Sequence, residues 1–194
     1  MARHARKRGP IDRAPVAAAG LETRHASARS GTRRAGPGHR QRAWPKLTAV
    51  VDAASHLIVG AVPGVGPSQD SPDFAPAVRQ AAGLLAFDAV LADAGYDAEH
   101  NHRLCREELG VRQAVIALNP RNAGDRWPKA PYRRAMRQDF PAGLYRQRWH
   151  AESAFSRHKR RLGSALTARG GGAQQRELVP RVLTHNLALL ASAA

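Results

Sequence analysis

The chain has 194 residues, of which 43% are hydrophobic, and this is enough for one domain with a buried core. Lys and Arg number 31 against 15 Asp and Glu, so the formal net charge of +16 lies far outside the range of ordinary cytosolic enzymes. Such a charge favours a polyanionic partner. A genome rich in Arg codons would also raise the charge, but the basic residues here are segregated along the chain.

Cysteine usage and hydropathy narrow the cellular setting. Cys105 is the single cysteine, which excludes an intrachain disulfide and fits a reducing compartment. No apolar run approaches the roughly 18 to 20 residues of a membrane span, and no hydrophobic segment of a secretory signal follows the basic N-terminus. We therefore expect a cytoplasmic protein with no membrane partner.

The N-terminal part is strongly basic and lacks a sustained hydrophobic period. Residues 1–46 carry twelve Lys and Arg against only Asp12 and Glu22. This composition is typical of mobile segments. We expect a disordered basic arm over residues 1–14 and a mobile basic loop over 25–45, with the short apolar run between them forming a strand.

The middle of the chain alternates between strand and helix patterns. "KLTAVVD" and "HLIVGAV" predict an antiparallel hairpin. A helix is predicted over 72–82, a buried strand over 88–93, a helix that ends at Gly110, and another strand over 112–118. This order indicates an α/β domain with a partly parallel sheet.

The last third begins with a long connection, residues 119–143, that is basic and rich in Pro and Gly. A loop of this length in a compact domain is usually functional or mobile. A helix is predicted over about 142–162, and the chain ends in an amphipathic helix. The apolar side of that helix is expected to carry Leu178, Val182, Leu183, Leu187 and Leu190.

Asp93 is the first candidate site residue. It follows "AVL" at the carboxyl end of a predicted parallel strand, and ligands of open α/β sheets bind outside such ends. An Asp that caps or turns the chain before Gly95 would occupy the same position. Position alone leaves both interpretations open.

The stretch "YRQRWHAESAFSRHKRRLG" places one acid, Glu152, among basic residues. At 100° per residue, Tyr145, Arg148, Glu152 and Lys159 fall within an arc of roughly 60° on one helical face. A solvated salt-bridge face is the simpler interpretation, because Arg148 and Glu152 are four residues apart. Alternatively, a helix carboxylate facing the strand-end carboxylate of Asp93 would hold divalent metals for phosphodiester chemistry, with basic neighbours gripping phosphates.

The spacing Y-(2)-R-(3)-E-(6)-K, together with "LADAGYD", "VIALNPR" and "RVLTHNLALL", resembles the DDE transposases of bacterial insertion sequences with a Y-R-E-K signature. The similarity runs from about Pro15 to Leu190. It implies an α/β fold of the RNase H-like type, a mixed sheet flanked by helices, over residues 15–194. It also implies Mg²⁺ or Mn²⁺ in a two-metal site, DNA strand cleavage and transfer on insertion-sequence ends and target DNA, and a bacterial, nucleoid-associated location. It allows a homodimer in the DNA complex.

Carried over residue by residue, the resemblance makes Asp93 the second catalytic acid and Glu152 the third, both as metal ligands. Tyr145, Arg148 and Lys159 would then contact DNA near the cut. Each of these positions matches the motif of the family.

The first acid of the family pattern is absent. Relatives have Asp-x-Thr-Gly on the first strand, and the matching stretch here reads "AAAG", so Ala17 stands at the aspartate position. Asp52, at the end of the next strand, is a candidate replacement, and Asp12 and Asp70 are expected to be less well placed. The domain that precedes this strand in relatives is also missing, so the resemblance implies an N-terminally truncated chain.

Two other features are weighed against simpler roles. Trp127 lies in the long basic connection and is the best candidate for stacking on bases, whereas core or interface packing is expected for Trp149. "EHNHRLC" lacks a fourth ligand at zinc spacing, so Cys105 is expected to be a small core residue.

The sequence therefore predicts a transposase that is weakened or inactive because Ala17 replaces the first acid. The alternative is a non-catalytic, DNA-binding remnant of a transposase, which Ala17 favours. A ribosomal or nucleoid-type basic protein would leave the spacing around Glu152 unexplained.

Overall fold

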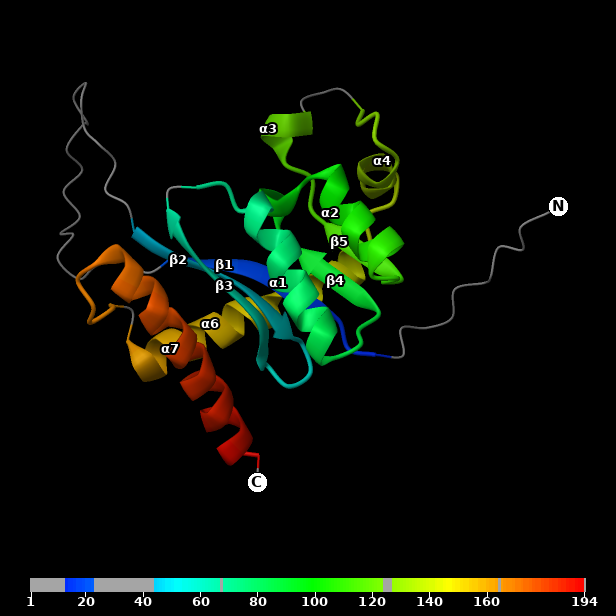
Figure 1. Cartoon of the computed structure of the whole chain (residues 1–194). Helices are drawn as coiled ribbons and strands as arrows, with labels where there is room; N and C mark the ends of the chain where they lie inside the picture. Colours follow the sequence, from blue (N-terminus) through cyan, green and yellow to red (C-terminus); the bar gives the residue numbers. More distant parts are fainter. Residues whose placement is uncertain (1–12, 23–43, 67, 124–126, 164, 194) are drawn as a thin grey trace, which may run out of the picture.

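The computed structural model describes residues 13–22, 44–66, 68–123, 127–163 and 165–193. Their centre is a five-stranded sheet with the order β3-β2-β1-β4-β5 (Figure 1). The strands are β1 (Val16–Glu22), β2 (Trp44–Asp52), β3 (Ile58–Gly66), β4 (Ala89–Ala92) and β5 (Gln113–Ile116). The first three are antiparallel neighbours, and β4 and β5 run parallel to β1. The sheet is therefore mixed, and the predicted hairpin is β2 and β3.

Helices flank both faces of the sheet, so the expected α/β fold of the RNase H-like type is confirmed. In Figure 1, α1 lies in front of the sheet, and α6 passes behind it. The helical segments are α1 (Ser71–Leu84), η1 (Ala94–Tyr96), α2 (Glu99–Arg103), η2 (Leu104–Glu108), α3 (Pro120–Ala123), α4 (Pro131–Gln138), α5 (Ala142–Tyr145), η3 (Arg146–Arg148), α6 (Trp149–Leu162) and α7 (Gly171–Ala191).

The strand β1 separates two hydrophobic clusters because its side chains alternate between the two faces of the sheet. Val16 and Ala18 pack with α1 and with the buried thiol of Cys105, as expected for a small core residue. Ala17, between them, packs with α6 and α7 on the other face. The side chains of these three residues of β1 are fully buried. The position of the missing acid therefore faces the helix that carries Glu152.

The carboxyl ends of β1, β4 and β5 meet at one edge of the sheet because these strands are parallel. Ala18 pairs with Ala92, so Asp93, the next residue, lies directly at this edge. Ligand sites of open α/β sheets lie outside such ends. We call this edge, with Asp93 at its centre, the carboxyl edge.

The prediction of a long irregular connection over residues 119–143 is wrong in part, because this segment contains α3 and α4. Pro131 stands at the start of α4, where its missing N–H is not needed. The carboxylate of Glu99 accepts hydrogen bonds from the backbone N–H groups of Tyr132 and Arg133, both at 3.1 Å. The cap therefore comes from a distant residue, which local sequence reasoning does not reveal.

The expected apolar side of the last helix, α7, is also partly wrong. Leu178 and Val182 are buried as predicted, but Leu183, Leu187 and Leu190 are each more than half exposed. The buried side of α7 continues instead through His185. The next residue, Asn186, forms hydrogen bonds with the backbone of the edge strand β3. The Asn186 side chain accepts from the N–H of Ile58 at 2.9 Å and donates to its C=O at 2.8 Å. These polar contacts with β3 fix which face of the helix is covered.

Some predictions concern residues outside this description. The basic arm over 1–14 and the loop over 25–45 lie almost wholly there, except that residues 13 and 14 are described and that Trp44 and Pro45 begin β2. Trp149 is 52% exposed, so of the expected core or interface packing the core role is wrong and the interface role stays a prediction; its ring stacks on His150 at 4.0 Å. Within the described ranges, no helix is long and apolar enough to cross a bilayer.

Two glycines offer a matched test of the packing between α1 and β3. A Cβ at Gly60 would overlap the backbone oxygen of Ala77, whereas a Cβ at Gly83 would meet nothing. We expect Gly60→Ala to lower the free energy of unfolding by about 1–3 kcal/mol, since α1 must move away from the sheet. Gly83→Ala should raise it by roughly 0.5–1 kcal/mol, because alanine favours the helix. Urea unfolding measures both, and equal effects would contradict this packing.

Candidate functional site

Asp93 is held in place by the turn that follows β4. Its backbone is extended, with φ −77° and ψ 177°, and its Oδ1 accepts a hydrogen bond from the N–H of Gly95 at 2.9 Å. The capping role weighed for this residue is therefore present. This hydrogen bond uses only Oδ1, one of the two carboxylate oxygens, and the side chain remains partly exposed at the carboxyl edge. Capping and a site role are thus compatible.

The segment from α5 to α6 brings three of the predicted residues to Asp93. Tyr145 ends α5, Arg148 ends the 3-10 turn η3, and Glu152 lies in the first turn of α6. The predicted single helix over 142–162 is therefore three contiguous helical segments. The Arg148 guanidinium donates to Glu152 Oε1 at 2.6 Å and lies 5.7 Å from the centre of the Tyr145 ring. The salt bridge weighed from the sequence exists, and both of its charges act on Asp93.

Charges at the carboxyl edge act directly on Asp93. Burial raises the pKa of its carboxyl group above the ordinary value, while the Gly95 hydrogen bond and Arg148 oppose this shift. The negative charges of Asp70 and Glu152 raise the same pKa further. Asp93 therefore lies within electrostatic reach of two other acids, one from α6 and one from the start of α1. A bound cation would relieve this repulsion.

Asp52, the candidate replacement for the first acid, lies at the wrong end of the sheet. It pairs with Val16, at the beginning of β1, and Val16 in turn pairs with Val90 rather than with the end of β4. Its carboxylate bonds Ser55 in the turn of the hairpin. The hypothesis fails because β2 runs antiparallel to β1, so the end of β2 is opposite to the carboxyl edge.

Asp70 is better placed than the sequence suggested. A Cβ built on Gly95 would lie 2.9 Å from Asp70 Oδ2 and 3.1 Å from Asp93 Oδ1. Both carboxylates therefore approach Gly95, Asp93 through the oxygen that already accepts the Gly95 N–H. The other oxygen of Asp70, Oδ1, accepts from the ammonium of Lys46 at 2.7 Å.

Lys46 links the start of α1 to the sheet. Its side chain is only 2% exposed, and its Nζ also lies 3.0 Å from Asp73 Oδ2 and 3.1 Å from the backbone oxygen of Gln69. Burial alone would lower its pKa, but the hydrogen bonds and charges of Asp70 and Asp73 outweigh burial, so the pKa is raised. The ammonium therefore remains charged and fixes the position of Asp70.

The acids at the carboxyl edge fit a hard divalent metal in kind, since Mg²⁺ and Mn²⁺ prefer carboxylate oxygens and keep several waters. Asp70 and Glu152 both act electrostatically on Asp93, from the start of α1 and from α6. Across the described ranges, no three His, Cys, Asp or Glu side chains lie close enough together to hold one ion. The structure thus offers the donors without a closed three-ligand group.

Comparison with known families agrees with this geometry. Residues 9–187 match the family model described as the transposase DDE domain. The chain belongs to the DDE transposases. The predicted family is therefore confirmed over nearly the whole chain, and the acids at the carboxyl edge belong to a transposase domain.

The missing first acid of this transposase domain can now be placed in three dimensions. Ala17 is fully buried on the α6 side of β1, in the same cluster as Ala151 and Phe155. It pairs with Leu91, which packs on the same α6 side of the sheet. Asp93 follows Leu91 by two residues, so strand alternation turns its side chain towards α6 as well. An aspartate at the Ala17 position would point to the face from which Glu152 comes.

Lys159, the fourth residue of the Y-R-E-K pattern, lies two helical turns beyond Glu152 and is exposed. It stands apart from the acids, beside Arg160 and Arg161 at the end of α6. The structure therefore brings Tyr145, Arg148 and Glu152 to Asp93, and leaves Lys159 on an outer basic surface of the transposase domain.

Trp127 is 53% exposed, and the Arg137 guanidinium of α4 lies 5.8 Å from its ring centre. α4 is anchored near the carboxyl edge by Arg133, whose guanidinium donates to both oxygens of Asp97 at 2.7 and 2.8 Å. An exposed indole beside basic residues suits stacking on an unpaired base. Sequence reasoning missed Asp97 and Glu99 as anchors of this segment.

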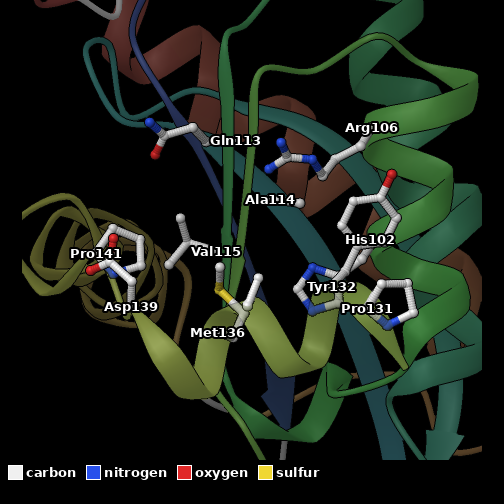
Figure 2. A pocket seen from close by; sticks show the side chains of 11 residues that line it. His102, Arg106, Gln113, Ala114, Val115, Pro131, Tyr132, Met136, Asp139 and Pro141 are labelled. Carbon is white, nitrogen blue, oxygen red and sulfur yellow. The ribbon is translucent and has the colours of Figure 1, made fainter. Parts of the chain in front are cut away.

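A cavity of about 430 Å³ lies between β5 and α4 (Figure 2). Val115 and Met136 give it an apolar wall, and the Arg106 guanidinium lies 5.4 Å from the centre of the Tyr132 ring beside it. Among the described residues that line it, Asp139 is the single acid. The cavity therefore shows that α4 stands away from the sheet, and it is separate from the acids of the carboxyl edge.

Proposed function

We propose that this transposase domain binds the DNA of an insertion sequence and carries the site for metal-dependent strand cleavage and transfer, in a form weakened by Ala17. The observation that carries the proposal is that Arg148, bonded to Glu152, lies in a turn that packs against β1 and β4, so that both charges act on Asp93. Two acids from separate elements at a strand-end edge are what a two-metal phosphodiester site requires.

Asp93 and Glu152 would hold Mg²⁺ or Mn²⁺, which when bound activates the attacking oxygen and stabilises the leaving oxygen. The residues of the chain have separate tasks. Arg148 balances the charge of Glu152 and is positioned to meet a phosphate, and the partly buried Tyr145 orients Arg148 through its ring. Lys159 and Trp127 would contact the DNA farther from the cut.

Ala17 supports a weakened activity because a fully buried alanine supplies no metal ligand where the family has an aspartate. The second candidate function, a DNA-binding remnant without chemistry, is favoured by the same residue. Mn²⁺-dependent nicking of supercoiled DNA separates them. Nicking that Glu152→Gln abolishes would support the enzyme, whereas DNA binding without nicking, even at high Mn²⁺, would support the remnant.

The partners follow from the proposed chemistry. DNA at the ends of the element and at the target would lie along the exposed basic side of α6, and the protein would act in the bacterial cytoplasm at the nucleoid. The homodimer that the family resemblance allows stays a prediction.

Lys159→Ala should weaken DNA binding and lower the slope of log affinity against log salt by about one unit, since one phosphate contact is lost. Fluorescence anisotropy over a salt series measures this slope. Arg79→Ala is the matched control, because Arg79 is an exposed cation of α1 on the opposite face of the sheet, paired with Glu108. An unchanged slope for Lys159→Ala, or an equal change for Arg79→Ala, would contradict a phosphate contact at Lys159.

A further inference from the structure

Two histidines face each other where α7 packs beside α6 (Figure 1). The side chains of His158 and His185 are each 1% exposed, and their ring centres lie 5.8 Å apart with the ring planes at 50°. We propose that this pair is an acid-sensitive latch, which holds α7 against α6 and the β2–β3 hairpin while both imidazoles are neutral and releases α7 when they take up protons. The latch concerns the packing of the domain and does not depend on the proposed DNA chemistry.

The pair is buried without the partners that a charged imidazole requires. Among the described residues, both ring nitrogens of His158 and the Nδ1 atom of His185 have no hydrogen-bond partner. The Nε2 atom of His185 lies 3.3 Å from the backbone oxygen of His56, in the turn of the hairpin. A protonated imidazole carries two N–H donors, and burying a charge without partners costs far more than burying the neutral ring. Protonation therefore opposes this packing.

The charges around the pair act in the same direction. The cations of α6 and α7 that act on the two rings are Arg157, Lys159, Arg161 and Arg181. Burial, and then the neighbouring His185 and the nearby cations, lower the pKa of His158 to about 4. Burial also lowers the pKa of His185, although its contact with the backbone of His56 opposes this shift. Both rings are therefore neutral at pH 7.

The acids on the surrounding elements are engaged with other groups. Glu177 of α7 is paired with Arg181 at 2.7 Å. Asp52, at the end of β2, acts on His56 in the hairpin turn, where His150 of α6 also acts. The other charged side chain of β2, Lys46, is bonded to the acids at the start of α1, and β3 has no charged residue. The surrounding charges thus keep the pair neutral.

The pair lies where α7 is joined to the rest of the domain. Next to His185, the side chain of Asn186 bonds both backbone groups of Ile58 in β3. The opposite side of the helix adds no hold within the described chain, since Leu183 and Leu187 are more than half exposed there. Segments with few buried contacts open at the lowest free energy. Loss of the contact at His185 is therefore sufficient to release α7.

The direction of the pH dependence follows from the lowered pKa of His158. In the released helix this imidazole regains the ordinary pKa of 6.5, whereas in the packed helix it stays neutral down to about pH 4. The released state therefore binds more protons between these limits, and the packing of α7 weakens as the pH falls through them. For one such group, a fall from about pH 7.5 to about pH 5 raises the released fraction on the order of tenfold or more.

Amide hydrogen exchange of the full chain at about pH 7.5 and about pH 5, with each rate divided by the intrinsic rate at that pH, tests the latch. We expect the protection of α7 to fall about tenfold or more, while β1 stays about tenfold or more better protected than α7 at the lower pH. His158→Leu should remove most of this fall, because leucine cannot take up a proton. His100→Leu is the matched control, since His100 is exposed on α2, and it should leave the fall unchanged.

A fall of the same size in the natural protein and in His158→Leu would overturn the latch. Equal exchange rates for α7 and β1 at about pH 5 would also overturn it, because acid would then unfold the whole domain. Titration of the imidazole NMR signals of the natural protein tests the same point even if His158→Leu does not fold. A His158 ring that stays neutral at about pH 5 while α7 is packed supports the latch, and one that titrates near the ordinary pKa in the packed protein overturns it.

Discussion

Ala17→Asp should raise Mn²⁺-dependent nicking of supercoiled DNA on the order of 100-fold, the size of effect that one well-placed charged group contributes to a transition state. The physical reason is the direction of the side chain. Ala17 is on the α6 face of β1, beside Leu91 and two residues before the position opposite Asp93. The new carboxylate would join Asp93 and Glu152 on one side of the sheet.

Strand alternation supplies the control for this variant. Ala18 is as buried as Ala17 but faces α1 in the other hydrophobic cluster. Ala18→Asp should therefore lower stability without increasing nicking, and Mn²⁺ should raise the melting temperature of Ala17→Asp more than that of Ala18→Asp. The account would be contradicted if both variants responded to Mn²⁺ alike, or if a folded Ala17→Asp bound and cut no better than the natural protein.

Lys46→Met should lower the free energy of unfolding by about 3 kcal/mol, because removing one partner of a buried ion pair leaves charge without compensation. The Lys46 side chain is 2% exposed, and its ammonium is shared by Asp70 and Asp73. Methionine preserves the length of the apolar stem and removes the ammonium group with its charge and its hydrogen bonds. Urea denaturation at neutral pH measures the difference.

The matched control is Arg79→Met. The Arg79–Glu108 ion pair is exposed on both sides, at 52% and 56%, and such pairs contribute about 1 kcal/mol or less. A loss for Lys46→Met no greater than that for Arg79→Met would show that the group of Lys46, Asp70 and Asp73 does not hold α1 to the sheet.

The sheet and Asp93 were predictable because short apolar strands and their terminal residues leave local signals. "AVL" followed by Asp and Gly marked both the end of β4 and the candidate site residue. The Arg148–Glu152 pair followed from a spacing of four residues. These features depend on a few consecutive residues, and the structure retains them.

The parts that sequence reasoning missed depend on contacts between distant segments. Asp70 reaches Asp93 because Lys46, more than twenty residues earlier, fixes its position, and no local pattern encodes that contact. Asp52 was misplaced because the antiparallel pairing of β2 reverses the end to which its last residue points. In α7, leucines occupy two faces of the helix. The side chain of Asn186, also in α7, bonds Ile58 of the edge strand β3, and this contact decides which face is buried.

An anomalous-scattering map of crystals soaked in Mn²⁺, for the natural protein and for Ala17→Asp, tests the central claim most directly. We predict a Mn²⁺ peak bonded to Asp93 in both proteins, with Glu152 added in the second. Peaks confined to acids away from the carboxyl edge, or no peak at Asp93 in either protein, would contradict a metal site built on Asp93.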